Sequence, residues 1–299
     1  MKAPISFWLT LAGLWACATA GAFIYAQQQS IPQPLVLAAL PAVLLEVGLY
    51  LTMAFPAIWS PWKNAKPIKI ACGLMAASLL PWAVYTISAG AFPPKASGTL
   101  ILLVATVAFW YILLPATLVT DLGLLTILAL VTIFKGALFR DTGIYPDLTA
   151  RVRMDFLSQF MWIRLGVGVM LLIRKVEGVG FGFWPTREEW SIGARQYLRS
   201  MPWVVVTGYA VGNLKLTTDP PAWWLIPVLA IGIFFGYFWT VALSEEFFLR
   251  GLLLNWLRGI MSSPVSAAVI TALISGAVHL RFRGPFNWRM AILSAVAHW

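Results

Sequence analysis

Apolar runs long enough to cross a lipid bilayer recur along this sequence, and they limit the possible folds more than any motif does. The first run, Ile5 to Ala26, carries no charge, and about 20 apolar residues suffice for a helix to span the hydrocarbon core. No small-residue cleavage site precedes the polar Gln27-Gln28-Gln29, so we interpret this run as a retained helix rather than a signal peptide.

The runs that follow predict an all-α, polytopic transmembrane helix bundle of about eight to ten membrane helices. Only 11% of the residues are charged and 60% are hydrophobic, whereas soluble domains carry roughly twice that charged fraction. The further candidate spans cover residues 35–55, 69–92, 98–117, 121–139, 156–173, 200–214, 222–243 and 264–280, and residues 244–258 are predicted to form a helix at or just within the membrane.

Basic residues indicate the orientation, because cytoplasmic loops are enriched in lysine and arginine. Lys2 precedes the first span, and Lys63, Lys66 and Lys69 follow the second. The N-terminus is therefore predicted to be cytoplasmic. The net charge of +10 is explained by these flanks and by anionic lipid headgroups, so it indicates no nucleic-acid partner.

Three ionisable side chains, Glu245, Glu246 and Arg250, lie inside an otherwise apolar stretch. Each charge at the bilayer centre costs about 3 kcal/mol, so such a cluster is a functional-site hypothesis. In a helix, Glu246 and Arg250 lie four residues apart on one face and can pair, while Glu245 points about 100° away. We therefore predict Glu245 as a general base supported by the other two residues. The alternative is a buried ion pair beside a glutamate that reaches the aqueous interface.

His279 is the candidate partner of Glu245. It follows 34 residues later, after one further membrane crossing, so the acid and the imidazole can lie at the same depth and share a water molecule. A structural histidine at a helix end remains an alternative. Ser275, four residues before it, could form a serine dyad, although a helical serine more often bonds its own i−4 carbonyl.

Upstream of this cluster, Thr186 and Glu189 have the spacing of a capping box at a helix start. The helix that they begin carries Arg187, Arg195 and Arg199. We expect it to lie along the cytoplasmic headgroups of the membrane.

The pattern Glu245-Glu246-x-x-x-Arg250, followed by a helix that ends in His279, resembles the first two motifs of the CPBP family of CAAX prenyl endopeptidases and bacteriocin-processing proteins. The resemblance covers about residues 180–299. It implies a helical bundle in a bacterial inner membrane whose catalytic cavity opens to the cytoplasm, with Glu245 and His279 activating water and Glu246 and Arg250 shaping the site. We divide the chain into an N-terminal transmembrane region of unknown role, residues 1–150, and a protease region, residues 151–299.

The sequence departs from this family in two places. The family usually has phenylalanine where this chain has Ser275. Its third motif, a histidine followed four residues later by Asn, Asp or His, is expected tens of residues beyond His279, but the sequence ends at Trp299. His298 has no partner after it, so we assign it no role. We expect a C-terminal truncation, which would leave this polypeptide inactive.

The resulting hypothesis is an intramembrane endopeptidase that cleaves a membrane-bound or lipidated peptide. The alternative is a catalytically inactive membrane partner, such as a bacteriocin self-immunity or regulatory protein.

The sequence lacks a two-histidine zincin motif, so we predict no cofactor and keep a divalent metal as the lesser possibility. Cys17 and Cys72 both lie in apolar spans and indicate no disulfide framework. The sequence does not predict the oligomeric state.

Overall fold

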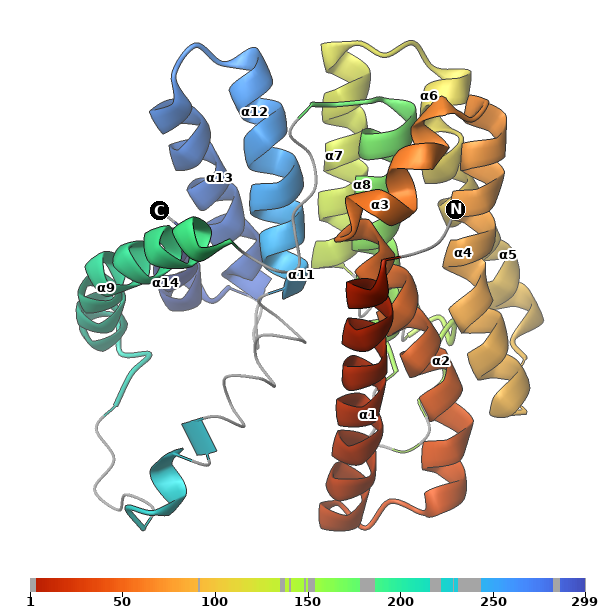
Figure 1. Ribbon diagram of the computed structural model, residues 1–299, viewed down its shortest axis with the longest axis horizontal. Coiled ribbons are helices and arrows are strands. Elements are labelled where there is room, and N and C mark those ends of the chain that lie inside the picture. Colours follow the sequence, from red (N-terminus) through yellow and green to blue (C-terminus); the bar gives the residue numbers. More distant parts are fainter. Residues whose placement is uncertain are drawn as a thin grey trace. The chain divides into compact units, whose positions relative to one another are not determined.

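Every regular element in the described part of the chain is a helix, and no strand occurs there (Figure 1). The computed structural model describes residues 4–90, 92–134, 138–139, 141–147, 149, 154–177, 186–215, 222–227, 229–230, 243–281 and 286–298. The prediction of an all-α polytopic bundle is confirmed.

Four of the described helices are long and apolar enough to cross a membrane. They are α1 (Ile5–Gln28), α2 (Gln33–Met53), α4 (Pro67–Ser88), and α8 (Phe156–Gly168) with its π-helical continuation η3 (Val169–Ile173). The apolar helices α5 (Pro94–Ala108), α7 (Leu118–Ile133) and α13 (Pro264–Val278) are shorter. The span predicted at 222–243 falls mostly outside the described residues.

The span predicted at 98–117 is wrong as a single helix. Helix α5 ends at Ala108, and a short helix, α6 (Trp110–Leu113), follows. The backbone departs from helical geometry at Phe109, where φ is −97° and ψ is 5°. The chain then passes through the non-helical residues 114–117 before α7 begins.

The chain divides into two compact units, one built from the helices up to residue 176 and the other from those after residue 186. In the N-terminal unit, α1 packs against α2, and α8 packs against α2, α4, α5 and α7. The short helices α3 (Pro56–Trp59) and η1 (Ser60–Asn64) connect α2 to α4. Helix α8 is thereby the centre of this unit.

A buried ion pair joins two of these helices. The Arg164 guanidinium in α8 donates from Nε and Nη2 to the two carboxylate oxygens of Glu46 in α2, each at 2.9 Å, and Nη2 also donates to the Ala77 carbonyl at 3.1 Å. Both side chains are only 1% exposed. The Glu46 carboxyl is thus hydrogen-bonded within the bundle.

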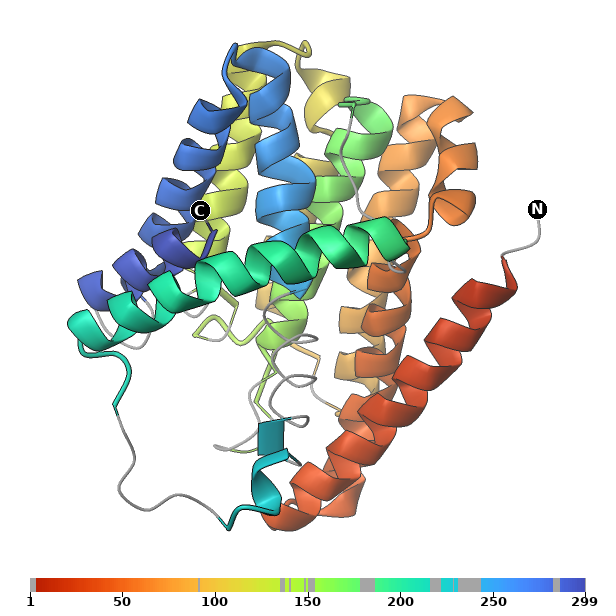
Figure 2. The same ribbon diagram turned by 60° about the vertical axis from the view of Figure 1, so that its left-hand side comes forward.

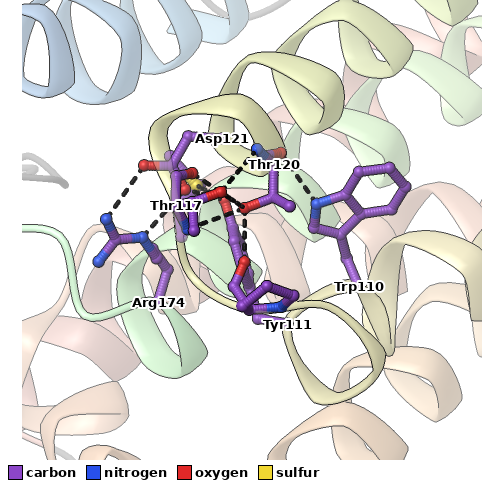
Figure 3. Close-up of polar contacts among 8 residues, drawn as sticks. Trp110, Tyr111, Thr117, Thr120, Asp121 and Arg174 are labelled. Carbon is purple, nitrogen blue, oxygen red and sulfur yellow. Dashed lines mark hydrogen bonds and ion pairs between the residues drawn. The ribbon is translucent and has the colours of Figure 1, made fainter.

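Asp121 is hydrogen-bonded in the same unit (Figure 3). It lies in the first turn of α7. Its carboxylate accepts from Arg174 Nε at 2.9 Å and from Tyr111 Oη at 2.6 Å. A capping box between Thr117 and Thr120 fixes the start of this helix. The cluster thus ties α6, α7 and the end of η3 together.

The C-terminal unit contains α9 (Arg187–Ala210), α11 (Leu243–Glu246), the π-helix η5 (Phe247–Leu254), α12 (Asn255–Ile260), α13, η6 (His279–Arg281) and α14 (Trp288–His298). Helix α9 packs against α14 (Figure 2), and α13 packs against η5 and α14. The separate span predicted at 200–214 is wrong, because α9 continues through Pro202 to Ala210.

The capping box predicted at the start of α9 is confirmed. Thr186 N–H donates to Glu189 Oε2 at 2.6 Å, and Glu189 N–H donates to Thr186 Oγ1 at 3.3 Å. The hydrogen bond from the Thr186 backbone lowers the pKa of the Glu189 carboxyl.

The first turn of α9 is expected to loosen in acid. Because the pKa of Glu189 is lower in the folded helix, its contribution is present above the unfolded pKa and is lost as the pH falls through the folded value. The protection factor of the Thr186 amide, which donates to the Glu189 carboxylate, should therefore fall in acid after correction for the intrinsic exchange rate, and Glu189→Gln should remove that pH dependence. The neighbouring Glu188→Gln is the matched control. An unchanged profile in Glu189→Gln would contradict the role of the carboxylate.

Candidate active site

The double glutamate lies where an α-helix passes directly into a π-helix. Helix α11 ends at Glu246, and η5 runs from Phe247 to Leu254 before α-helical geometry resumes in α12. The sequence predicted an uninterrupted helix here but not its π-helical middle. Asn255 Nδ2 donates to the Arg250 carbonyl at 3.0 Å, which satisfies a backbone acceptor of this segment. Single π-helical segments within α-helices occur frequently at functional sites.

Glu246 and Arg250 form the ion pair that their spacing predicts, with 3.1 Å between Arg250 Nη1 and Glu246 Oε2. Their side chains are 41% and 50% exposed on the C-terminal unit. Glu245, by contrast, is 24% exposed and has different partners. The two glutamates of the motif therefore have different surroundings, as the helix geometry indicated. Their roles in the site stay predictions.

Glu245 and His279 lie together. The ring nitrogen His279 Nε2 is 3.3 Å from Glu245 Oε1. Helix α13 presents this ring, because it starts at Pro264, after the N-cap Ser263, and ends where His279 becomes its C-cap. The predicted proximity of the acid and the imidazole is confirmed by this distance. The catalytic role of either group stays a prediction.

His298, to which the sequence gave no role, is a third member of the cluster. Its Nε2 lies 3.9 Å from Glu245 Oε2, the carboxylate oxygen that does not face His279. The ring comes from the last described turn of α14. The two imidazoles thus face the two oxygens of one carboxylate, and both rings are nearly nine-tenths buried.

Close packing of α13 against α14 brings the two histidines together. A Cβ atom added at Gly276 would lie 2.7 Å from the Ala291 carbonyl oxygen and 3.1 Å from Ala295 Cβ. No real side chain fits at the first distance, so glycine is required where the two backbones approach. The small residues Ala291 and Ala295 complete this contact from α14.

The arrangement suits proton transfer. A carboxylate and the unprotonated nitrogen of a neutral imidazole are both acceptors, so a close contact between them is favourable only when a proton or a proton donor such as water is shared. Glu245 has one such contact at hydrogen-bonding range and a second, longer one. A partly enclosed acid beside two imidazoles is able to take a proton from water and to pass it on.

A metal ion at this site has less support than proton transfer by the side chains. No group of three or more His, Cys, Asp or Glu side chains within the described ranges is arranged so that it could hold one. We therefore assign no metal ligand and derive no chemical step through a metal ion.

Comparison with known families adds an independent observation. Residues 227–299 match the family model described as Type II CAAX prenyl endopeptidase Rce1-like. The CPBP resemblance is confirmed for these residues. We refer to them as the Rce1-like region, and Glu245, His279 and His298 all lie within it. Searches of curated proteins and of solved structures found no match.

The match supports a membrane endopeptidase at the level of the family. Together with the long apolar helices, it identifies the chain as an integral membrane protein. The Rce1-like region begins after α9, so the family match covers neither α9 nor the N-terminal unit.

A local signal for His298 was present in the sequence. The segments Ser275-Gly-Ala-Val-His279 and Ser294-Ala-Val-Ala-His298 repeat one pattern, in which serine precedes histidine by four residues. Comparing the two helix ends with each other, rather than with a family motif, would have found the second histidine.

Proposed function

We propose that the chain is an intramembrane endopeptidase that hydrolyses a peptide bond of a membrane-associated or lipidated substrate. The observation that carries this proposal is the Glu245 carboxylate with an imidazole nitrogen facing each of its oxygens, at 3.3 and 3.9 Å. The family match of the region that contains all three side chains supports it.

In the proposed reaction, Glu245 accepts a proton from a water molecule while the water oxygen attacks the carbonyl carbon of the scissile peptide bond. The resulting tetrahedral intermediate collapses when the C–N bond breaks, and the proton held by the Glu245–His279 pair passes to the leaving amine nitrogen. One water is consumed, and a carboxylic acid and an amine are released.

The imidazoles of His279 and His298 have a supporting part in this scheme. His279 Nε2, in direct contact with Glu245, shares the transferred proton and orients the carboxylate. The 3.1 Å contact with Arg250 holds the Glu246 carboxylate away from the reacting oxygen.

The test is cleavage of a membrane-tethered reporter peptide, with and without a C-terminal lipid, by the purified full chain in lipid vesicles. Glu245→Gln is expected to lower the turnover about 10²- to 10⁴-fold, the usual contribution of a general base, without lowering the unfolding temperature. Glu188→Gln, an exposed acid outside the cluster, is the control and should cleave as the parent chain does.

Equal cleavage by Glu245→Gln and the parent chain would refute the proposal. An absence of cleavage in the parent chain with either reporter would favour the non-catalytic membrane partner. Cleavage of the lipidated reporter alone would assign the substrate class.

A further inference from the structure

The two histidines are held by a reciprocal pair of serines. Ser275 and Ser294 each lie four residues before a histidine, on α13 and α14 respectively. Residues four apart share one face of a helix, so each helix presents one hydroxyl and one imidazole to the other. Both serines are buried, at 1% and 5% exposed.

The contacts cross between the helices. Ser275 Oγ lies 2.9 Å from His298 Nδ1, and Ser294 Oγ lies 3.0 Å from His279 Nδ1. The two serine oxygens are 2.8 Å apart. Each serine therefore contacts the histidine of the opposite helix, and one hydroxyl donates to the other in the middle of the cluster.

Backbone carbonyls decide which ring nitrogen carries the proton. His279 Nδ1 is 2.9 Å from the Ser275 carbonyl oxygen, and His298 Nδ1 is 2.9 Å from the Ser294 carbonyl oxygen. A carbonyl oxygen only accepts, so both Nδ1 atoms must donate. The serine hydroxyls then accept from the same Nδ1–H groups, and both Nε2 atoms face Glu245, where a proton shared with the carboxylate makes the close contact favourable.

We propose that Ser275 and Ser294 are positioning residues that hold both imidazoles in the Nδ1–H tautomer and aim both Nε2 atoms at Glu245. The catalytic consequence rests on the proposed endopeptidase function, whereas the tautomer and the crossed contacts stand on the hydrogen bonds alone. The hydrogen bonds at Nδ1 orient each ring and also fix its tautomer, because the bond that one ring nitrogen makes generally sets which nitrogen of a histidine is protonated.

The composition of the chain makes a direct test practical. His279 and His298 are its only two histidines, so a ¹H–¹⁵N spectrum of protein labelled at histidine contains signals from these two rings alone. In the neutral state, we expect both rings to show a protonated Nδ1 and an unprotonated Nε2. The single variants His279→Gln and His298→Gln assign the two sets of signals.

Replacing each serine shows whether it supports the histidine of the opposite helix or the histidine of its own helix. Ser275→Ala is expected to shift the His298 ring signals most, and Ser294→Ala those of His279. The control is Thr271→Val, which removes another buried hydroxyl of α13 whose bond goes to the Ala267 carbonyl within its own helix. It should leave both rings unchanged.

In the cleavage assay, each serine variant is expected to lower kcat about tenfold with little change in KM, as the loss of an orienting partner typically does, and Ser→Thr should restore part of it. If Ser275→Ala shifts His279 rather than His298, or shifts neither ring, the inference is overturned. A spectrum in which Nε2 carries the proton would overturn it as well.

Failure of the proposed function has a different signature. Suppose that each serine variant shifts the ring signals of the histidine on the opposite helix, but that the chain cleaves no reporter. The tautomer assignment would then stand, and the proposed endopeptidase function would be refuted. Normal cleavage by the double variant Ser275→Ala/Ser294→Ala would instead refute the positioning role of the serines, and the proposed endopeptidase function would stand.

Discussion

Gly276→Leu is expected to abolish cleavage and to destabilise the C-terminal unit by about 1–3 kcal/mol, the usual cost of inserting a side chain into a packed contact. The first atom of that side chain would already lie 2.7 Å from the Ala291 carbonyl oxygen, so α13 and α14 must separate to admit it. Because these helices carry His279 and His298, separating them moves both rings away from Glu245.

The measurement combines denaturant unfolding in detergent with the histidine spectrum. Gly193→Leu in α9 is the matched control, because a Cβ atom at Gly193 would meet nothing within 4 Å. The control is expected to unfold at the same denaturant concentration as the parent or slightly above it, since leucine favours a helix more than glycine does. A Gly276→Leu protein with parental stability and an unchanged spectrum would contradict the close approach of the two backbones.

Removing one member of the Glu46–Arg164 pair is expected to destabilise the N-terminal unit by about 3–5 kcal/mol. Glu46→Leu leaves the guanidinium without its carboxylate between α2 and α8, and within the described residues the Ala77 carbonyl remains as its hydrogen-bond partner. A buried charge without a counter-charge is far costlier than the pair itself contributes.

The double variant Glu46→Leu/Arg164→Leu provides the decisive comparison. Since a buried pair replaced by apolar residues often loses little stability, the double variant should be more stable than Glu46→Leu alone. Arg199→Leu, which removes an exposed arginine of α9, is the control and should change the unfolding free energy by less than about 0.5 kcal/mol. A double variant that loses the sum of both single losses would show that the two side chains act independently.

Local geometry was predictable from the sequence, and long-range pairing was not. Helical spacing predicts the Glu246–Arg250 pair and the capping box at Thr186, because their members are separated by less than two turns. The partner of Glu46 lies 118 residues away, and nothing in the local pattern points to Arg164 among the other arginines.

The same distinction explains the candidate site. One membrane crossing after the acid was enough to place His279, whereas placing His298 required the packing of α13 on α14 at Gly276. The π-helical turn of η5 was missed because its residues suit an α-helix equally well. The candidate span at 200–214 was wrong because α9 continues through Pro202 to Ala210.

The C-terminal unit holds all the side chains of the proposed reaction, with Glu245, Ser275 and His298 drawn from three of its helices. The residues of the proposed reaction therefore come from a different part of the sequence than α1 to α8. The ion pairs Glu46–Arg164 and Asp121–Arg174 connect residues of the N-terminal unit with one another. The leading helices could then be exchanged or remodelled in evolution while the reacting groups keep their arrangement within the C-terminal unit.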